Sequence, residues 1–211
     1  MSRKLAILFS CIFLCSASWA QETNLLRGPS PKLRKFLTDH PTALKALNHA
    51  FSDAFSGRTV GLNYFYSDDE HEPKALHFYP HTAGLPEVLI CVRENQLPLD
   101  EFTGVLFEIL NSKGEPRFAQ LIEDAKAGTI SRTEFARAIL KVEFEADKTT
   151  RDLLGRLDLG ENDKAKSYYY GRYRDLPDDF EGYLSFIKRA SPNFDAIGRY
   201  ELQYDSLRKN Q

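Results

Sequence analysis

The sequence predicts an α+β fold, with an N-terminal helix, a small and mostly antiparallel three-stranded sheet, and a helical C-terminal half. Three observations predict it. The 211 residues are 42% hydrophobic and 27% charged, as in a folded globular domain. Short runs with strand character lie between residues 59 and 93, and from Leu99 onward apolar residues recur three or four apart. No internal repeat is present, so we expect a single domain over residues 42–211.

The first 20 residues have the pattern of a signal peptide. Arg3 and Lys4 precede an apolar run from Leu5 to Cys15, and small residues stand at Ser18 and Ala20. The run is too short to span a membrane, which takes roughly 20 apolar residues. We therefore expect cleavage after Ala20, a secreted or periplasmic protein, and no stable membrane insertion. The alternative is lipoprotein processing at Cys11, which the bulky Phe9 disfavours.

The mature chain is expected to begin with a flexible segment over residues 21–41, because its start is polar and contains Gly28, Pro29 and Pro31. Apolar residues from Leu44 to Phe55 then follow helical spacing, and Gly57 ends that helix. Strands are expected over Thr59–Tyr66, Ala75–Tyr79 and Glu87–Arg93. Short connections between these strands favour antiparallel pairing.

The C-terminal half contains several helix signals. Pro98 opens a helix to about Ser112, and Pro116 and Gly128 bracket the next one. Ser131 and Glu134 form a capping box at the start of a long helix that ends near Leu157. Two more helices are expected over residues 178–190 and 193–208.

Charge and cysteine content exclude several classes of function. The net charge is −2 with both signs spread along the chain, so no nucleic-acid partner is expected. Signal cleavage would leave Cys91 as the only cysteine, inside an apolar run, and we expect a buried, inert thiol.

The helix that begins near Pro98 has two faces. Phe102, Val105, Leu106 and Ile109 form one apolar stripe, while Phe107 and Asn111 lie one turn apart on another face beside Glu108. Gly104 on that second face would allow a neighbouring segment to approach closely. Downstream, Glu143 to Asp147 read E-F-E-A-D.

The order of elements and these residues resemble the zincins, zinc metallopeptidases in which a helix carries H-E-x-x-H after the last strand. The window Phe107 to Asn111 occupies the place of that motif, and E-F-E-A-D resembles a stretch that supplies a glutamate ligand. The resemblance implies that Glu108 matches the general base and that Glu143 or Glu145 matches the third ligand. The two histidines are replaced by Phe107 and Asn111, so no metal site and no cofactor are expected.

Two other groups of residues offer alternatives. Histidines from His71 to His81 could join Glu108 in a metal-dependent, peptidase-like hydrolase. Tyr169, Arg172 and Tyr173 could stack on a carbohydrate or cell-wall ligand, or pack into the core. We interpret the chain as a catalytically inactive zincin-like protein that acts as a binding or scaffold protein. Its partner would be an unidentified protein, peptide or cell-wall ligand.

Overall fold

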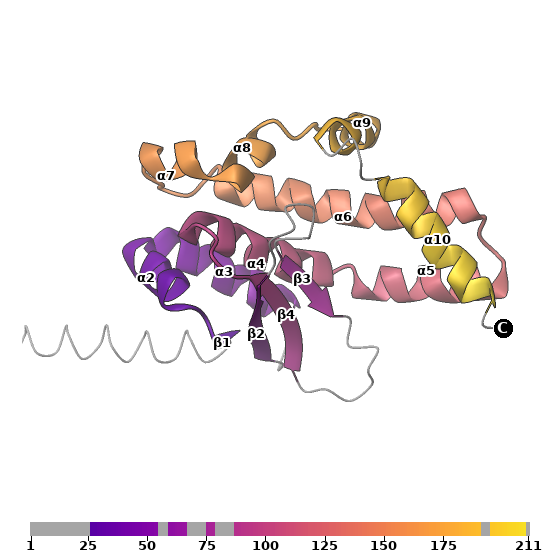
Figure 1. Cartoon of the computed structure of the whole chain (residues 1–211), viewed down its shortest axis with the longest axis horizontal. Coiled ribbons are helices and arrows are strands. Elements are labelled where there is room, and N and C mark those ends of the chain that lie inside the picture. The colour runs from indigo at the N-terminus through magenta and orange to yellow at the C-terminus, as the bar shows by residue number, and fades with distance from the viewer. Residues whose placement is uncertain (1–25, 55–58, 67–74, 79–86, 191–194, 210–211) are drawn as a thin grey trace, which may run out of the picture.

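The structure is a computed structural model, and it describes residues 26–54, 59–66, 75–78, 87–190 and 195–209. The chain is mixed α and β, and most of the described residues are helical (Figure 1). The elements in chain order are β1 (Leu26–Arg27), α2 (Pro31–Asp39), α3 (Pro41–Ala54), β2 (Thr59–Phe65), β3 (Ala75–Phe78), β4 (Glu87–Arg93), α4 (Pro98–Ser112), α5 (Glu115–Ala127), α6 (Arg132–Leu154), α7 (Glu161–Lys166), α8 (Tyr168–Arg174), α9 (Phe180–Ala190) and α10 (Ala196–Lys209). The signal peptide predicted over residues 1–20 lies outside the described residues.

The sheet corrects the predicted topology. Strands β2, β3 and β4 lie where the sequence predicts them, but among the described residues the sheet has four strands in the order β1-β2-β4-β3. Strand β2 pairs in parallel with β1 and β4, and only β3 runs antiparallel to its neighbour β4. The expectation of a three-stranded, mostly antiparallel sheet is therefore wrong. A short connection does not force consecutive strands to pair, and β3 lies at the edge while β4 takes the place beside β2.

The segment expected to be flexible over residues 21–41 contains β1 and α2. Helix α2 begins with Pro31, and the Ser30 hydroxyl caps it by accepting a hydrogen bond from the Leu33 amide at 3.0 Å. Leu33 is fully buried, and Phe36 and Leu37 are nearly so. Burial of this apolar face stabilises α2 against the core, although the residues before it are polar.

Helix α4 lies between the sheet side and the helical half of the molecule. It contacts α2, α3, β3 and β4, and it also contacts α6 and α8. Its stripe residues Phe102, Val105, Leu106 and Ile109 are fully buried. Asp100 and Glu101 in its first turn are buried too, and both are hydrogen-bonded: Asp100 accepts from the Ser167 hydroxyl at 2.6 Å and Glu101 from the Tyr64 hydroxyl at 2.6 Å.

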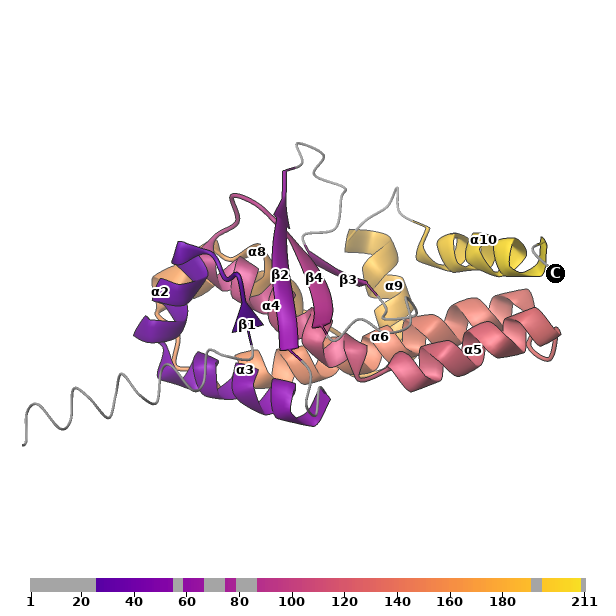
Figure 2. The same ribbon diagram turned by 90° about the horizontal axis from the view of Figure 1, so that it is seen from below.

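Helices α5 and α6 form a hairpin that runs away from the sheet (Figure 2). The capping box at Ser131 and Glu134 is present, as predicted. Gly114 turns the chain from α4 into α5, and a Cβ atom at this position would overlap Val142 of α6. Only glycine therefore fits where this corner meets α6.

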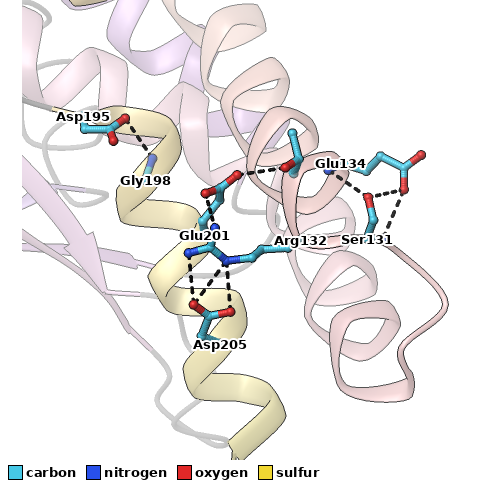
Figure 3. Close-up of polar contacts among 8 residues, drawn as sticks. Ser131, Arg132, Glu134, Asp195, Gly198, Glu201 and Asp205 are labelled. Atoms are coloured by element: carbon cyan, nitrogen blue, oxygen red, sulfur yellow. Dashed lines mark hydrogen bonds and ion pairs between the residues drawn. The ribbon is translucent and has the colours of Figure 1, made fainter.

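Helix α10 lies across the α5–α6 hairpin and is held there by Arg132 (Figure 3). The Arg132 guanidinium pairs with Asp205 at 3.0 Å and with Glu201, which also accepts a hydrogen bond from Thr133 at 2.9 Å. Beneath it, a second apolar cluster forms, separate from the main core; its buried members are Phe118, Ala125, Phe135, Ile139 and Val142.

Candidate functional site

The second face of α4 lies in the interior. Glu108 is 6% exposed and Asn111 is 5% exposed, while Phe107 is half-buried. A Cβ atom added at Gly104 would lie 3.1 Å from Cβ of Ala75 on β3 and 3.8 Å from the ring of Tyr169 on α8. The glycine thus allows the close approach that the sequence predicts, and the neighbours are the edge strand and α8.

Helix α6 faces α4 with two acids one turn apart, Glu143 and Asp147. Asp147 is 2% exposed, and Glu143 is half-buried. Glu145 points the other way: its side chain is 51% exposed and pairs with Arg117 of α5. The sequence leaves open whether Glu143 or Glu145 matches the third ligand. The structure brings Glu143, and not Glu145, towards Glu108.

Asp147 is the centre of a hydrogen-bonded network. Its two carboxylate oxygens accept hydrogen bonds from the Tyr173 hydroxyl at 2.8 Å and from the Tyr183 hydroxyl at 2.9 Å. The guanidinium of Arg172 lies 3.8 Å from the same carboxylate. Burial raises the pKa of Asp147, and the charge of Arg172 and the two tyrosine hydrogen bonds oppose that rise.

Glu143 is the second acid of the site, and it connects the site to α10. Its carboxylate accepts a hydrogen bond from the Tyr200 hydroxyl. Burial raises the pKa of Glu143 to about 7, and the negative charges of Asp147 and Glu108 add to the rise, whereas the Tyr200 hydrogen bond and Arg199 lower it. Glu143 therefore changes charge near neutral pH, and it does so within electrostatic range of Glu108.

Two polar atoms of the site are buried without a hydrogen-bond partner among the residues that the structure describes. They are Oδ1 of Asn111, an acceptor, and Nε of Arg172, a donor. A buried polar group without a partner costs about 1–3 kcal/mol, so these two atoms mark positions where a water molecule would be bound favourably.

No protein-family model, curated protein or solved structure matches this chain. Phe107 has no donor atom for a metal and Asn111 offers a neutral amide oxygen, so the residues at these positions do not fit a zinc ion. Among the described residues, no group of three His, Cys, Asp or Glu side chains is arranged to hold a metal ion.

The structure brings together three of the residues singled out in the sequence. Glu108, Glu143 and Arg172 lie around Asp147 where α4, α6 and α8 meet. Tyr173 is 2% exposed and bonded to Asp147, so its ring is a core group and not a stacking platform at the surface. Of the other predicted sites, His71 and His81 lie outside the described residues, as does the side chain of His77.

Sequence reasoning missed the importance of Asp147, Tyr183 and Tyr200. The helical spacing of Glu143 and Asp147 is a signal that could have paired them, since residues four apart share a helix face. No comparable signal points to Tyr183 and Tyr200. They come from α9 and α10, and only the tertiary fold brings them to the two acids.

Proposed function

We propose that this chain is a catalytically inactive, zincin-like protein that acts by binding outside the cytoplasm, in a secreted or periplasmic location. The proposal rests on the resemblance in sequence and on the chemistry of the α4–α6 interface. No catalytic step is assigned to the site, because its residues do not fit the zinc ion on which zincin chemistry depends.

The arrangement of elements supports the proposal. Helices α2 and α3 precede strands β2 to β4, α4 follows the last strand β4, and α6 contacts α4. Glu108 and Glu143 interact through their charges across this interface, as expected for the matches to the general base and the third ligand. In this interpretation the chain keeps the two carboxylates of a zincin site, Glu108 and Glu143, and has lost its two histidines.

The observation that carries the proposal is the partly exposed cation of Arg172 beside the buried Asp147 carboxylate. Arg172 of α8 lies 3.8 Å from Asp147, and its side chain is 29% exposed. Buried carboxylates need a compensating positive charge or a proton, and a metal ion supplies the charge in a metallopeptidase. In this chain the guanidinium compensates Asp147, and a raised pKa of about 7 allows Glu143 to keep its proton.

Zinc titration of a restored site tests the proposal. The double variant Phe107→His, Asn111→His returns the two missing ligands to the helix that carries Glu108, and we expect it to bind zinc with micromolar or tighter affinity. The wild-type chain should bind zinc at least about 100-fold more weakly. Isothermal titration calorimetry measures both, and circular dichroism checks that each variant is folded.

Two triple variants identify the third ligand. Adding Glu143→Gln to the double variant should weaken zinc binding at least tenfold, because the third ligand is lost. Adding Glu145→Gln, on the exposed side of α6, should leave the affinity unchanged. A folded double variant that does not bind zinc would refute the zincin-like interpretation, and zinc-dependent peptidase activity of the wild type would refute the inactive one.

A further inference from the structure

A pocket lined by residues of α2, α4 and α7 carries an inference that does not depend on the zincin-like interpretation. It has a volume of about 460 Å³ and is lined by residues of α2, the start of α4 and α7. Helices α2 and α7 lie at the left-hand end of the ribbon in Figure 1. We call it the α2–α4–α7 pocket. Its lining residues are Pro31, Lys32, Lys35, Phe36, Asp39, His40, Leu97, Pro98, Leu99, Asp163 and Lys166. The volume is within the range of roughly 300–1,000 Å³ typical of small-molecule sites.

The pocket is apolar inside. Phe36 and Leu99 are buried and belong to the main core, so they form a rigid base. Leu97 is 44% exposed, and it is one of few large apolar side chains with such exposure in the described part of the chain. An exposed leucine next to two prolines favours a ligand with a hydrocarbon portion.

The charges around the pocket are unequal. Three lysines and two aspartates line it, and Lys35 is already paired with Asp39 at 2.7 Å. Lys32 in the first turn of α2 and Lys166 at the end of α7 form no ion pair with another described residue. Only Asp163 opposes these two lysines among the lining residues.

The nearby acids of α4 do not neutralise the two lysines. Asp100 accepts hydrogen bonds from the Ser167 hydroxyl and the Tyr169 amide, and Glu101 accepts them from Tyr64 and Ser30. Neither acid lines the α2–α4–α7 pocket. The helices that begin at Pro31 and Pro98 add the positive ends of their dipoles.

We propose that the α2–α4–α7 pocket binds an amphipathic carboxylate, with the hydrocarbon chain against Phe36, Leu97 and Leu99 and the carboxylate between Lys32 and Lys166. A single negative charge matches the excess of one lysine over the paired and opposing acids. A hydrocarbon chain matches the apolar interior.

Isothermal titration calorimetry with sodium decanoate tests the proposal on the full-length protein. We expect saturable one-to-one binding, and no binding of decyltrimethylammonium, which has the same chain and the opposite charge. The double variant Lys32→Gln, Lys166→Gln should bind decanoate at least tenfold more weakly. The matched control Lys45→Gln, Lys188→Gln changes two exposed lysines outside the pocket and should bind as the wild type does.

Substitutions of Leu97 distinguish the contribution of its apolar contact to decanoate binding from the effect of charge in the pocket. Leu97 is the N-cap residue of α4 and makes no capping hydrogen bond, so Leu97→Asn and Leu97→Asp both supply a good cap and should fold. We expect Leu97→Asn to weaken decanoate binding a few fold and Leu97→Asp to abolish it by repulsion. Absence of saturable binding at about 1 mM decanoate, equal binding of the ammonium probe, or unchanged binding by the Lys32 and Lys166 double variant would overturn the proposal.

Discussion

At the scale of single residues, the site is defined by how its buried acids are compensated. Asp147 has two tyrosine hydroxyls and a guanidinium, whereas Glu143 has one tyrosine hydroxyl and two acidic neighbours. The two acids therefore respond differently to pH. Glu143 has a pKa of about 7 in the folded chain, above the value of about 4.3 for an unperturbed glutamate.

This difference predicts how stability changes with pH. Between about pH 4.3 and pH 7 the unfolded chain loses the Glu143 proton while the folded chain keeps it, so the free energy of unfolding falls as pH rises. Glu143→Gln should reduce this fall by about 1–3 kcal/mol between about pH 5 and pH 8. The raised pKa of Asp147 acts in the same direction, so part of the slope will persist.

Urea denaturation at several pH values measures the slope. Glu145→Gln is the matched control, because this glutamate lies on the exposed face of the same helix and should leave the slope unchanged. Equal slopes for the wild type and Glu143→Gln would mean that Glu143 is ionised in the folded chain across this range.

At the scale of elements, local signals fix where helices begin and end. The capping box at α6 pairs the Ser131 hydroxyl with the Glu134 amide and the Glu134 carboxylate with the Ser131 amide (Figure 3). Both contacts are local in sequence, which is why the start of this helix is predictable from four residues.

Ser131→Ala removes the cap of the longest helix in the described part of the chain. We expect the free energy of unfolding to fall by about 0.5–2 kcal/mol, because the Glu134 amide loses its acceptor. Ser185→Ala, at an exposed position inside α9, should be neutral or slightly stabilising, since alanine has the higher helix propensity. Thermal unfolding compares the two, and equal midpoints for both variants would contradict a stabilising role for the cap.

At the scale of the whole molecule, the sequence predicts elements better than their arrangement. Positions of strands β2 to β4 and the helical half follow from hydrophobic periodicity, and the structure confirms the α+β character. Strand order does not follow, because the pairing of β2 with β4 depends on contacts that no local pattern contains. The short helices α7 and α8 were also missed, since the tyrosine-rich run from Tyr168 to Arg174 suits a strand or a connector equally well.

The residues of the candidate site also fall into two groups: those that the sequence predicts and those that only the tertiary structure reveals. Glu108, Asn111 and Glu143 could be named from spacing along α4 and α6, because both helices have a clear inward face. The partners Tyr183 and Tyr200 lie 36 and 57 residues from the acids they bind. No periodicity spans such separations, and only packing of α9 and α10 against α6 reveals them.

No described helix is both long and apolar enough to cross a membrane.

The separation of the two apolar clusters implies that the chain has more than one cooperative unit. The main core contains α4 and the sheet, while Phe118, Phe135 and Val142 belong to the second cluster under α10. Ala196 is the only buried residue among the described residues of α10. Native-state hydrogen exchange should therefore show amides of α10 opening with a lower free energy than those of α4. Such opening would break the Tyr200–Glu143 hydrogen bond and expose Glu143 to water. Exchange in α10 should therefore accelerate as pH rises from about 4.3 to about 7 and show no further extra acceleration above that, beyond the ordinary chemical dependence of exchange on hydroxide. Equal opening free energies for α4 and α10 would instead indicate a single cooperative unit.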